Sequence, residues 1–526
     1  MKVFSVTRRN FLAMASAMGV ATVANSSHSW GQSEKVLRVR SQSDIQGIDP
    51  INPAAGADQD VMMAVFNKLV SYKPLYGSES ADEGWGWELE AAASIEELDS
   101  THVKFQLMPG IMWTNGFGEM TSEDVKYSFE RHAKLESWTA VDWDPLTEVQ
   151  IIDKYSGIMV FSEPFAPLFN STLPYGSGTI VCKAAVEKLD EKQFSVEPPA
   201  TSGPYKIESW TPKQKLVLTR HDGWPGEKPE FDRIEITPID DAKTAEIAFE
   251  AGQLDMTGIS ASSLPRYKSE MPSDSNLRVY PSLYYEWLGM NVDHEPFGDS
   301  RVRKAIQLAI DVDAIIDAAY FGAAERATGI IAPGLVGHRD SNIITAPNID
   351  KAKALLAEAG LGSGFKTTLD VHNNTDHVSA AQVIQANLAM IGVEVQINSH
   401  DSGTFWTLGL ESEGDAWKGI QLIYNRYSMA PDPYWATAWF TPEQIGEWNW
   451  ERWNSSEYGD LHEAAVRETD TQKRHDMYVK MQDMMEESGT YTFITHNISA
   501  FLYRNWVTPA MRPDGGNLMY RKFRAS

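Results

Sequence analysis

The sequence predicts an α/β fold, because helix and strand patterns alternate along the chain. The clearest unit lies in the C-terminal half. Residues 369–372 and 393–397 have the pattern of buried strands, and the segment between them places apolar residues on one helical face before Gly392 ends the helix. Such a unit implies two parallel strands joined by a right-handed crossover. With 526 residues, 42% of them hydrophobic, the chain can bury the core of roughly three domain-sized units.

Further elements are predicted on both sides of this unit. Apolar residues alternate or cluster in four segments that are expected to be strands, at 36–40, 102–107, 215–219 and 234–237. A helix is expected to begin at Thr121, which caps the free N–H groups, with Asp124 three residues further on. Two more helices are expected over 302–309 and after Asn348, and Gly360 ends the second. The short connections favour compact lobes over flexibly linked domains.

The charge balance argues against several classes of function. Lys and Arg number 46 and Asp and Glu number 72, so the formal net charge is −26. A surface this acidic repels nucleic acid and anionic lipid.

No GxSxG, HExxH, CxxC, GxGxxG or phosphate-loop pattern occurs, and the sequence predicts no catalytic residue, metal site or cofactor. Asp311, Asp313 and Asp317 flank the start of a helix and are interpreted as capping residues. The single cysteine, Cys182, is interpreted as a buried residue.

Residues 1–33 have the features of a cleaved export signal. Arg8 and Arg9 form a twin-arginine pair, and the apolar run 11–24 that follows is too short to span a bilayer. An ordinary secretory signal is the alternative interpretation. Cleavage is expected within 25–33, and no lipid anchor is expected because no cysteine follows the apolar run. The mature protein is predicted to be a soluble monomer of a bacterial periplasm.

A series of short blocks carries more information together than any of them alone. The most specific blocks are LMPGIMWTNG at 107–116, TSEDVKYSFER at 121–131 and TSGPYKIESW at 201–210, and Asp432-Pro433 follows near the expected place. In order and spacing, the blocks resemble the bacterial solute-binding protein family 5, the dipeptide, oligopeptide and nickel receptors of ABC importers. The resemblance runs along most of the chain and implies a receptor, not an enzyme.

The resemblance implies a two-lobed periplasmic binding protein of type II with a subdomain inserted in the first lobe. The implied limits are 34–76, 200–282 and 490–526 for lobe I, 77–199 for the inserted subdomain and 283–489 for lobe II. The lobes would close about hinges near Ser282 and Ser488 and bury a small solute between them. The closed receptor would then deliver the unchanged solute to the transmembrane subunits of an ABC permease.

The resemblance also raises the question of how a ligand's amino group is held. Peptide-binding members of the family hold it with an aspartate three residues before the acidic-Pro pair. Counting back from Asp432 lands on Met429, whose thioether cannot neutralise a buried ammonium. This departure argues against ordinary recognition of a free α-amine. Arg426 lies nearby and either binds a ligand carboxylate or phosphate through a bidentate fork or forms a structural salt bridge.

Candidate ligand contacts come from several segments. Ala54, Ala55 and Gly56 align with a family segment that lies along the ligand backbone, and their small size allows close approach. Trp113 either closes one side of the cleft or packs inside the inserted subdomain. The other candidates lie near the hinge, in the aromatic-rich segment or on the segment that the family uses for contact: Tyr284, Tyr285, Trp287, Trp406, Asn425, Arg426, Tyr427, Met429 and Asp432.

Several interpretations stay open. The leading one is a receptor for a peptide-like or other small polar solute. Met429 and the many Trp and Tyr residues between 406 and 453 make an oligosaccharide or an opine-like compound a rival ligand, because aromatic faces suit sugar rings and cations. A twin-arginine-exported enzyme with an unrecognised cofactor is the alternative from another class, and a chaperone or sensor with the same fold is a further one.

Overall fold

The computed structural model of the protein describes residues 34–52, 56–76, 85–135 and 138–525. The predicted export signal at 1–33 and the candidate residues Ala54 and Ala55 lie outside the described residues. Among the helices of the described ranges, none combines the length and the apolar character needed to cross a membrane.

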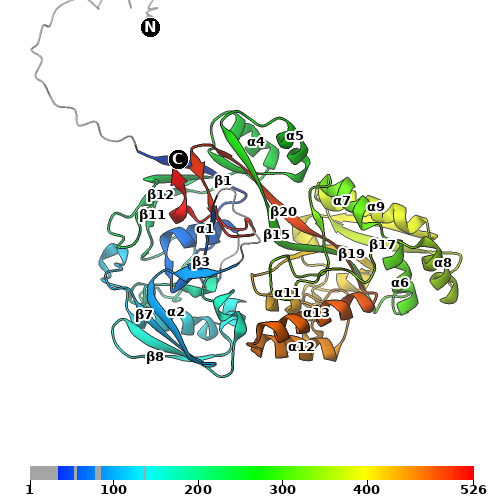
Figure 1. Ribbon diagram of the computed structural model, residues 1–526, viewed down its shortest axis with the longest axis horizontal. Helices are drawn as coiled ribbons and strands as arrows, with labels where there is room; N and C mark the ends of the chain where they lie inside the picture. The colour runs from blue at the N-terminus through cyan, green and yellow to red at the C-terminus, as the bar shows by residue number, and fades with distance from the viewer. Residues whose placement is uncertain (1–33, 53–55, 77–84, 136–137, 526) are drawn as a thin grey trace, which may run out of the picture. The chain divides into compact units, whose positions relative to one another are not determined.

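The largest sheet in the described ranges is mixed and has eleven strands in the order β11-β12-β13-β1-β14-β20-β15-β19-β17-β18, with β16 (Glu325–Arg326) paired to β20 (Figure 1). At one end, the lobe I strands are β11 (Tyr205–Thr211), β12 (Lys215–Arg220), β13 (Arg233–Pro238), β1 (Val36–Ser41) and β14 (Met256–Ile259). At the other end, the lobe II strands are β19 (Leu422–Ser428), β17 (Phe365–His372) and β18 (Val393–His400).

Two long strands connect the two ends of this sheet. β15 (Ser275–Met290) and β20 (Tyr491–Arg504) lie side by side in Figure 1 and pair antiparallel along most of their length. β20 also pairs with β14 of lobe I, and β15 also pairs with β19 of lobe II. The register of the β15–β20 pair shifts between Pro281 and Tyr285. The chain therefore crosses between the lobes where the backbone pairing is irregular.

Helices cover the lobe II strands in two groups. In the first group, α6 (Ser300–Ala309) packs on α8 (Ile349–Glu358), and α7 (Val312–Tyr320) packs on α9 (Thr375–Ala389). These helices share one apolar core with the strands, to which Leu369, Ile384 and Leu422 belong. The second group is α11 (Tyr434–Ala438), α12 (Ser456–Arg467) and α13 (Thr471–Glu487), and it contributes to a separate, aromatic-rich core.

The region predicted to be an inserted subdomain contains its own antiparallel sheet. Its strands are β6 (Ala92–Asp99), β7 (His102–Leu107), β9 (Ser156–Phe161) and β8 (Leu146–Ile151), in that order, and α2 (Ser122–Lys134) contacts β8. Phe105 and Phe129 of this region belong to the same buried cluster as Leu37 and Ile234 of lobe I. The inserted sheet and lobe I therefore share one core, to which α1 (Gly56–Val65) also contributes, whereas Phe249 of α4 (Ala242–Glu250) lies in a separate small cluster.

The predicted elements agree closely with the structure. The four predicted strands are β1, β7, β12 and β13, and β17 and β18 are parallel and joined through α9 as the strand–helix–strand pattern predicts. Asp124 Oδ2 accepts the backbone N–H of Thr121 at 2.9 Å, at the start of α2. The strand predicted at 369–372 begins earlier, at Phe365, because the polar residues 366–368 hide its apolar pattern. Asp311 caps α7, with Oδ1 3.0 Å from the N–H of Ala314, and Cys182 is buried.

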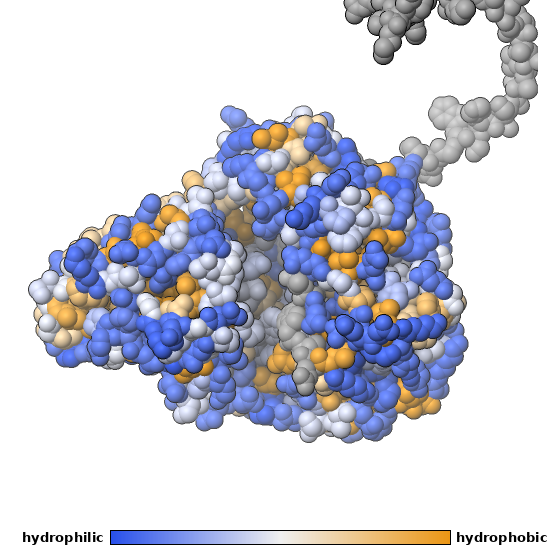
Figure 2. All heavy atoms as spheres, turned by 180° about the vertical axis from the view of Figure 1, so that it is seen from behind, coloured by the Kyte–Doolittle hydropathy of each residue, from blue (hydrophilic) through white to orange (hydrophobic). Residues whose placement is uncertain are grey.

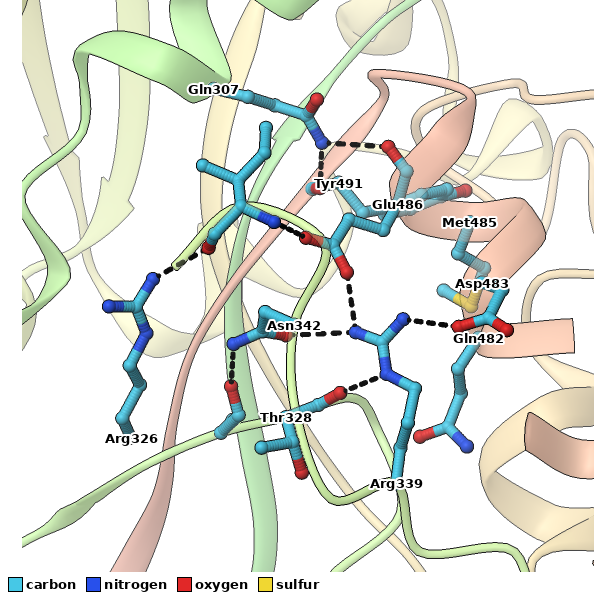
Figure 3. A network of polar contacts seen from close by, with 12 residues as sticks. Gln307, Arg326, Thr328, Arg339, Asn342, Gln482, Asp483, Met485, Glu486 and Tyr491 are labelled. Carbon is cyan, nitrogen blue, oxygen red and sulfur yellow. Dashed lines mark hydrogen bonds and ion pairs between the residues drawn. The ribbon is translucent and has the colours of Figure 1, made fainter. Parts of the chain in front are cut away.

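A buried polar network fixes the segment that follows β16 to helix α13 (Figure 3). Arg339 is 5% exposed and donates to Asp483 at 2.8 Å, to Glu486 at 2.6 Å and to the carbonyl of Thr328 at 2.5 Å. Glu486 also accepts the N–H of Ile344 at 2.8 Å. These bonds hold 328–344 against lobe II, although the segment has little regular secondary structure.

Candidate functional site

The carboxyl ends of β17 and β19 lie where β15 enters lobe II. β17 and β19 are parallel, and β15 runs antiparallel to β19, with Tyr284 opposite Ser428 at the end of β19. In open α/β sheets, ligands bind outside the carboxyl ends of the strands. Figure 2 shows a hollow between the two lobes on the face that it presents. We call this end of the lobe II strands the carboxyl edge, and it is the candidate binding site.

Arg426 and Tyr284 form the exposed rim of the carboxyl edge. The guanidinium carbon of Arg426 lies 4.7 Å from the centre of the Tyr284 ring, and Tyr284 is 44% exposed. Within the described residues, the side chain of Arg426 forms no hydrogen bond and no ion pair. Glu286, the residue opposite Arg426 on β15, lies near it, but no carboxylate of the described residues is within ion-pair distance. The planar fork of N–H donors of Arg426 can therefore bind a further acidic group.

Glu286 lies under this rim and is 1% exposed. Its carboxylate accepts hydrogen bonds from the hydroxyl of Tyr424 at 2.8 Å, from Asn497 Nδ2 at 3.0 Å and from the hydroxyl of Tyr320. Burial opposes ionisation of the carboxyl, but nearby His377 and Arg426 outweigh it and hold the pKa of Glu286 below its ordinary value. Glu286 is therefore a charged group whose acceptor sites are already used within the protein.

Three polar residues at the start of α9 complete the carboxyl edge. His377 is 3% exposed, its Nε2 lies 3.9 Å from Glu286 Oε1, and neither ring nitrogen has a hydrogen-bond partner in the described residues. The rings of His372 and His377 meet edge to face at 6.1 Å. Asp376 is half-buried, and burial and the neighbouring Glu286 raise its pKa.

Sequence reasoning missed these residues, although a signal was present. His372 ends a predicted strand, and Asp376 and His377 lie between it and the next predicted helix, which is where α/β folds place ligand contacts. In the structure they belong to the first turn of α9. Glu286 also gave a signal, because it interrupts an otherwise apolar and aromatic strand. A charged residue in a strand that is buried on both faces indicates a partner or a function.

Four of the predicted ligand contacts lie on the opposite face of β15 and β19. Tyr285, Trp287, Asn425 and Tyr427 are 7% exposed or less. Trp287 Nε1 donates to Glu451 Oε1 at 2.7 Å, and the three aromatic residues belong to the aromatic-rich core. Side chains alternate between the two faces of a strand, so these residues and the rim formed by Tyr284 and Arg426 cannot face the same way. Their contact with a ligand stays a prediction.

The acidic-Pro pair is used for packing. Asp432 is fully buried, and Arg474 donates to both of its carboxylate oxygens at 2.6 Å. Met429 is 4% exposed and belongs to the same aromatic-rich core as Tyr427. The structure therefore offers neither a free carboxylate at Asp432 nor a polar group at Met429.

The remaining predicted contacts are dispersed. Trp113 is 4% exposed, lies in the core of the inserted region and donates from Nε1 to Asp124 Oδ2 at 3.3 Å, which is the packing position considered from the sequence. Trp406 stacks on Tyr427, with ring centres 6.3 Å apart. Gly56 is the first residue of α1.

The inserted region also contacts lobe II directly. The buried carboxylate of Asp142 accepts hydrogen bonds from the hydroxyl of Tyr434 and from Trp435 Nε1, the latter at 3.0 Å. The rings of Tyr175 and Trp435 meet edge to face at 6.3 Å. Helix α11 is therefore tied to the inserted region through one buried acidic residue.

A cavity of about 490 Å³ lies elsewhere, beside β3 (Val70–Tyr72) and β5 (Trp87–Leu89). The charges that line it are paired: Arg521 with Glu90 at 2.6 Å, and Lys522 with Glu88 at 2.8 Å. Because these charges already have partners, the cavity offers a ligand fewer unpaired charged groups than the carboxyl edge does.

The fold and the carboxyl edge define a two-lobed α/β binding protein. The profile of "Bacterial extracellular solute-binding proteins, family 5 Middle" matches residues 87–446, and the chain belongs to this family of solute-binding proteins. The Dipeptide-binding protein of Escherichia coli K12 is 26% identical over 497 residues, which cover 88% of this chain and 89% of that protein. The Glutathione-binding protein GsiB of Salmonella paratyphi A is 25% identical over 383 residues, 70% and 73% of the two chains.

Solved structures agree with this fold. The ABC transporter substrate-binding protein CtaP of Listeria monocytogenes superposes with a TM-score of 0.79 at 19% identity, over 94% of this chain and 99% of that one. MoaA of A. tumefaciens R10, solved with mannopinic acid, superposes with a TM-score of 0.77 at 20% identity, over 94% and 100%. The two-lobed fold and the class of extracellular solute-binding protein, both predicted from the sequence, are confirmed.

Proposed function

We propose that this receptor captures a small, peptide-like or otherwise polar solute that carries a carboxylate. The observation that supports this ligand class is Arg426, which stacks on the exposed ring of Tyr284 at the carboxyl edge without an acidic partner in the described residues. An arginine held against an aromatic ring has fewer orientations open to it, which favours two-point binding of a carboxylate by its fork. Capture with a Kd of about 1 μM corresponds to about −8 kcal/mol.

The proposed mechanism is closure of the lobes about β15 and β20, with the predicted lobe limits except at the second hinge. We place one hinge near Ser282, beside the register shift in β15. We place the other opposite it at 496–498 in β20, and not near Ser488, because Pro281 pairs with Ile498 and Tyr285 pairs with His496. Closure would bury the solute and present both lobes to the transmembrane subunits of an ABC permease.

The proposed site of action is the periplasm, reached through the twin-arginine pair at Arg8 and Arg9. Replacing both arginines by lysine is expected to leave the protein in the cytoplasm of the producing bacterium, since the twin-arginine route requires the pair. Cell fractionation measures this. Undiminished export of the variant would instead assign the signal to the ordinary secretory route.

The receptor proposal is tested by recovering what the protein binds. Mass spectrometry of the purified protein under native conditions identifies a co-purifying solute, and a melting screen against peptides, opines and oligosaccharides follows, because binding to the native state raises stability. We expect a carboxylate-bearing solute that raises the melting temperature and is recovered unchanged. Preference for an uncharged oligosaccharide would overturn the ligand class, and conversion of the solute to a product would support the enzyme alternative.

A further inference from the structure

We propose that Asp376 and Arg426 form a two-sided clamp for a zwitterionic solute, in which Asp376 accepts hydrogen bonds from a ligand ammonium and Arg426 binds a ligand carboxylate. The inference rests on the proposed function and names the second charge that the solute carries. In the family pattern, the residue at position 429 holds the ligand's ammonium. Here that residue is Met429, and the proposal assigns the ammonium to Asp376 instead.

Asp376 has an acceptor capacity that the described protein does not use. Its side chain forms no hydrogen bond and no ion pair with any residue in the described ranges, although it is half-buried. It lies in the first turn of α9, directly after the carboxyl end of β17. A partly desolvated carboxylate without a donor is costly, and a ligand ammonium supplies both the donor and the opposite charge.

Arg426 has the complementary property. It is half-buried, carries a permanent positive charge and stacks on Tyr284. Asp376 directly precedes His377, whose Nε2 lies 3.9 Å from Glu286 Oε1, and Glu286 pairs with Arg426 across β15 and β19, yet Asp376 and Arg426 do not form an ion pair with each other. Two opposite charges that lie near each other, both without partners, fit a guest that carries both signs. His377 follows Asp376 in the chain, and its buried ring nitrogens, which form no hydrogen bond in the described residues, add polar contacts for the same guest.

The other carboxylates near the carboxyl edge already have partners. Glu286 accepts from Tyr320, Tyr424 and Asn497. Asp370 accepts from His400 Nε2 at 2.8 Å, and Asp401 caps α10 (Ser402–Phe405) by accepting from the N–H of Thr404 at 3.2 Å. Asp432 is bound by Arg474. Asp376 is therefore the carboxylate of this group that has no donor in the described residues.

The test uses three matched libraries with the full mature chain and native mass spectrometry. The first contains free dipeptides and opine-type N-carboxyalkyl amino acids, the second contains the same compounds acetylated at the amine, and the third the same compounds amidated at the carboxylate. We expect capture from the first library only. Capture of none of the zwitterions, or equal capture from the acetylated library, overturns the clamp. In the second case the proposed carboxylate receptor still stands, so the two failures are distinguishable.

Variants then show which residue binds which charge of the ligand. Their affinity for the zwitterion that binds most tightly is measured by calorimetric titration. Asp376→Asn is expected to lower affinity about tenfold or more and to abolish the preference for a free amine over its acetylated form. Arg426→Gln is expected to abolish the preference for the acid over its amide, and Arg426→Lys to retain part of it because the charge remains.

The matched control is Asp350→Asn. Asp350 occupies the same place in the first turn of α8, but it is exposed and its helix packs on α6. It is expected to leave affinity unchanged. If Asp376→Asn and Asp350→Asn have the same small effects on melting and none on ligand preference, Asp376 acts only on its helix and the clamp is refuted.

Discussion

Asp432 shows how a residue that looks functional in the sequence serves stability. Its carboxylate is fully buried and bound at both oxygens by Arg474, which is itself 4% exposed. A buried pair contributes little net stability compared with an apolar substitute, but removing one partner leaves an uncompensated charge. The acidic residue of the acidic-Pro pair is therefore explained in this chain by its ion pair with Arg474.

Removing one partner of this pair is expected to destabilise the protein strongly. Arg474→Met should lower the free energy of unfolding by about 3–5 kcal/mol, because Asp432 would stay buried without its cation. Urea denaturation measures the loss. The control is Lys366→Ala, which removes an exposed pair with Glu394 and should change stability by at most about 0.5 kcal/mol. Equal effects of the two substitutions would contradict the assignment.

Glu451 gives a second residue-level prediction, which concerns pH. Burial raises the pKa of Glu451 to about 7, above its ordinary value of 4.5, so the folded state binds the proton more tightly than the unfolded state. The contribution of this residue to stability is therefore present at low pH and is lost as the pH rises from about 4.5 through about 7. Glu451→Gln keeps an acceptor for Trp287 Nε1 and removes the ionisation.

We expect the free energy of unfolding to fall more steeply with pH in the natural protein than in Glu451→Gln. Between pH 5 and pH 8, the stability of the natural protein should fall by roughly 1–3 kcal/mol relative to Glu451→Gln. Urea denaturation at a series of pH values measures it, and Glu447→Gln, at an exposed position, should run parallel to the natural protein. Parallel curves for Glu451→Gln as well would show that Glu451 ionises as easily as an exposed acid.

At the scale of the elements, the sequence predicts most of the fold because the patterns of α/β elements are local. The parallel pair β17 and β18, the start of α2 and the end of α9 at Gly392, whose φ is +85°, all follow from apolar spacing and from capping residues. The register of β15 against β20 does not follow, because long-range pairing leaves no local signal.

The candidate site was predicted only in part, for a related reason. Tyr284 and Arg426, two of the predicted contacts, lie on the carboxyl edge, whereas Tyr285 and Tyr427, each one residue away, are packed in the core. Both faces of β15 and β19 are covered, so hydrophobic alternation does not tell which face meets the ligand. The residues of α9 had a sequence signal in their place after a predicted strand, but their approach to Arg426 follows only from the pairing of β17 with β19.

The N-terminus of α9 carries a prediction at this scale. Asn374 caps α9 by accepting the N–H of His377 at 2.7 Å, and Asn348 caps α8 by accepting the N–H of Lys351 at 3.0 Å. Replacing either residue by alanine should cost about 1 kcal/mol of stability. Only Asn374→Ala should also weaken solute binding, because it loosens the turn that carries Asp376. Urea denaturation and calorimetric titration separate the two effects, and equal binding by both variants would contradict a role for α9 in the site.

At the scale of the whole molecule, closure depends on contacts that lie outside the binding site. Asp142 of the inserted region is 2% exposed and accepts hydrogen bonds from Tyr434 and Trp435 of lobe II. Burial raises the pKa of Asp142, and Tyr434 opposes this by donating to it. Because these bonds form between the two lobes, they stabilise an arrangement in which the inserted region and α11 are together, and they would be lost when the lobes separate.

Removing this contact is therefore expected to shift the lobes apart without touching the solute. Asp142→Ala should increase the radius of gyration of the ligand-free protein in solution scattering and raise the apparent Kd by about three- to tenfold, since affinity falls with the fraction of the competent state. The control is Arg467→Ala, which removes the exposed pair with Glu163 across the same interface and should change neither quantity measurably. If Asp142→Ala lowers the melting temperature but leaves the radius and the Kd unchanged, the contact stabilises the fold and does not set the balance between open and closed lobes.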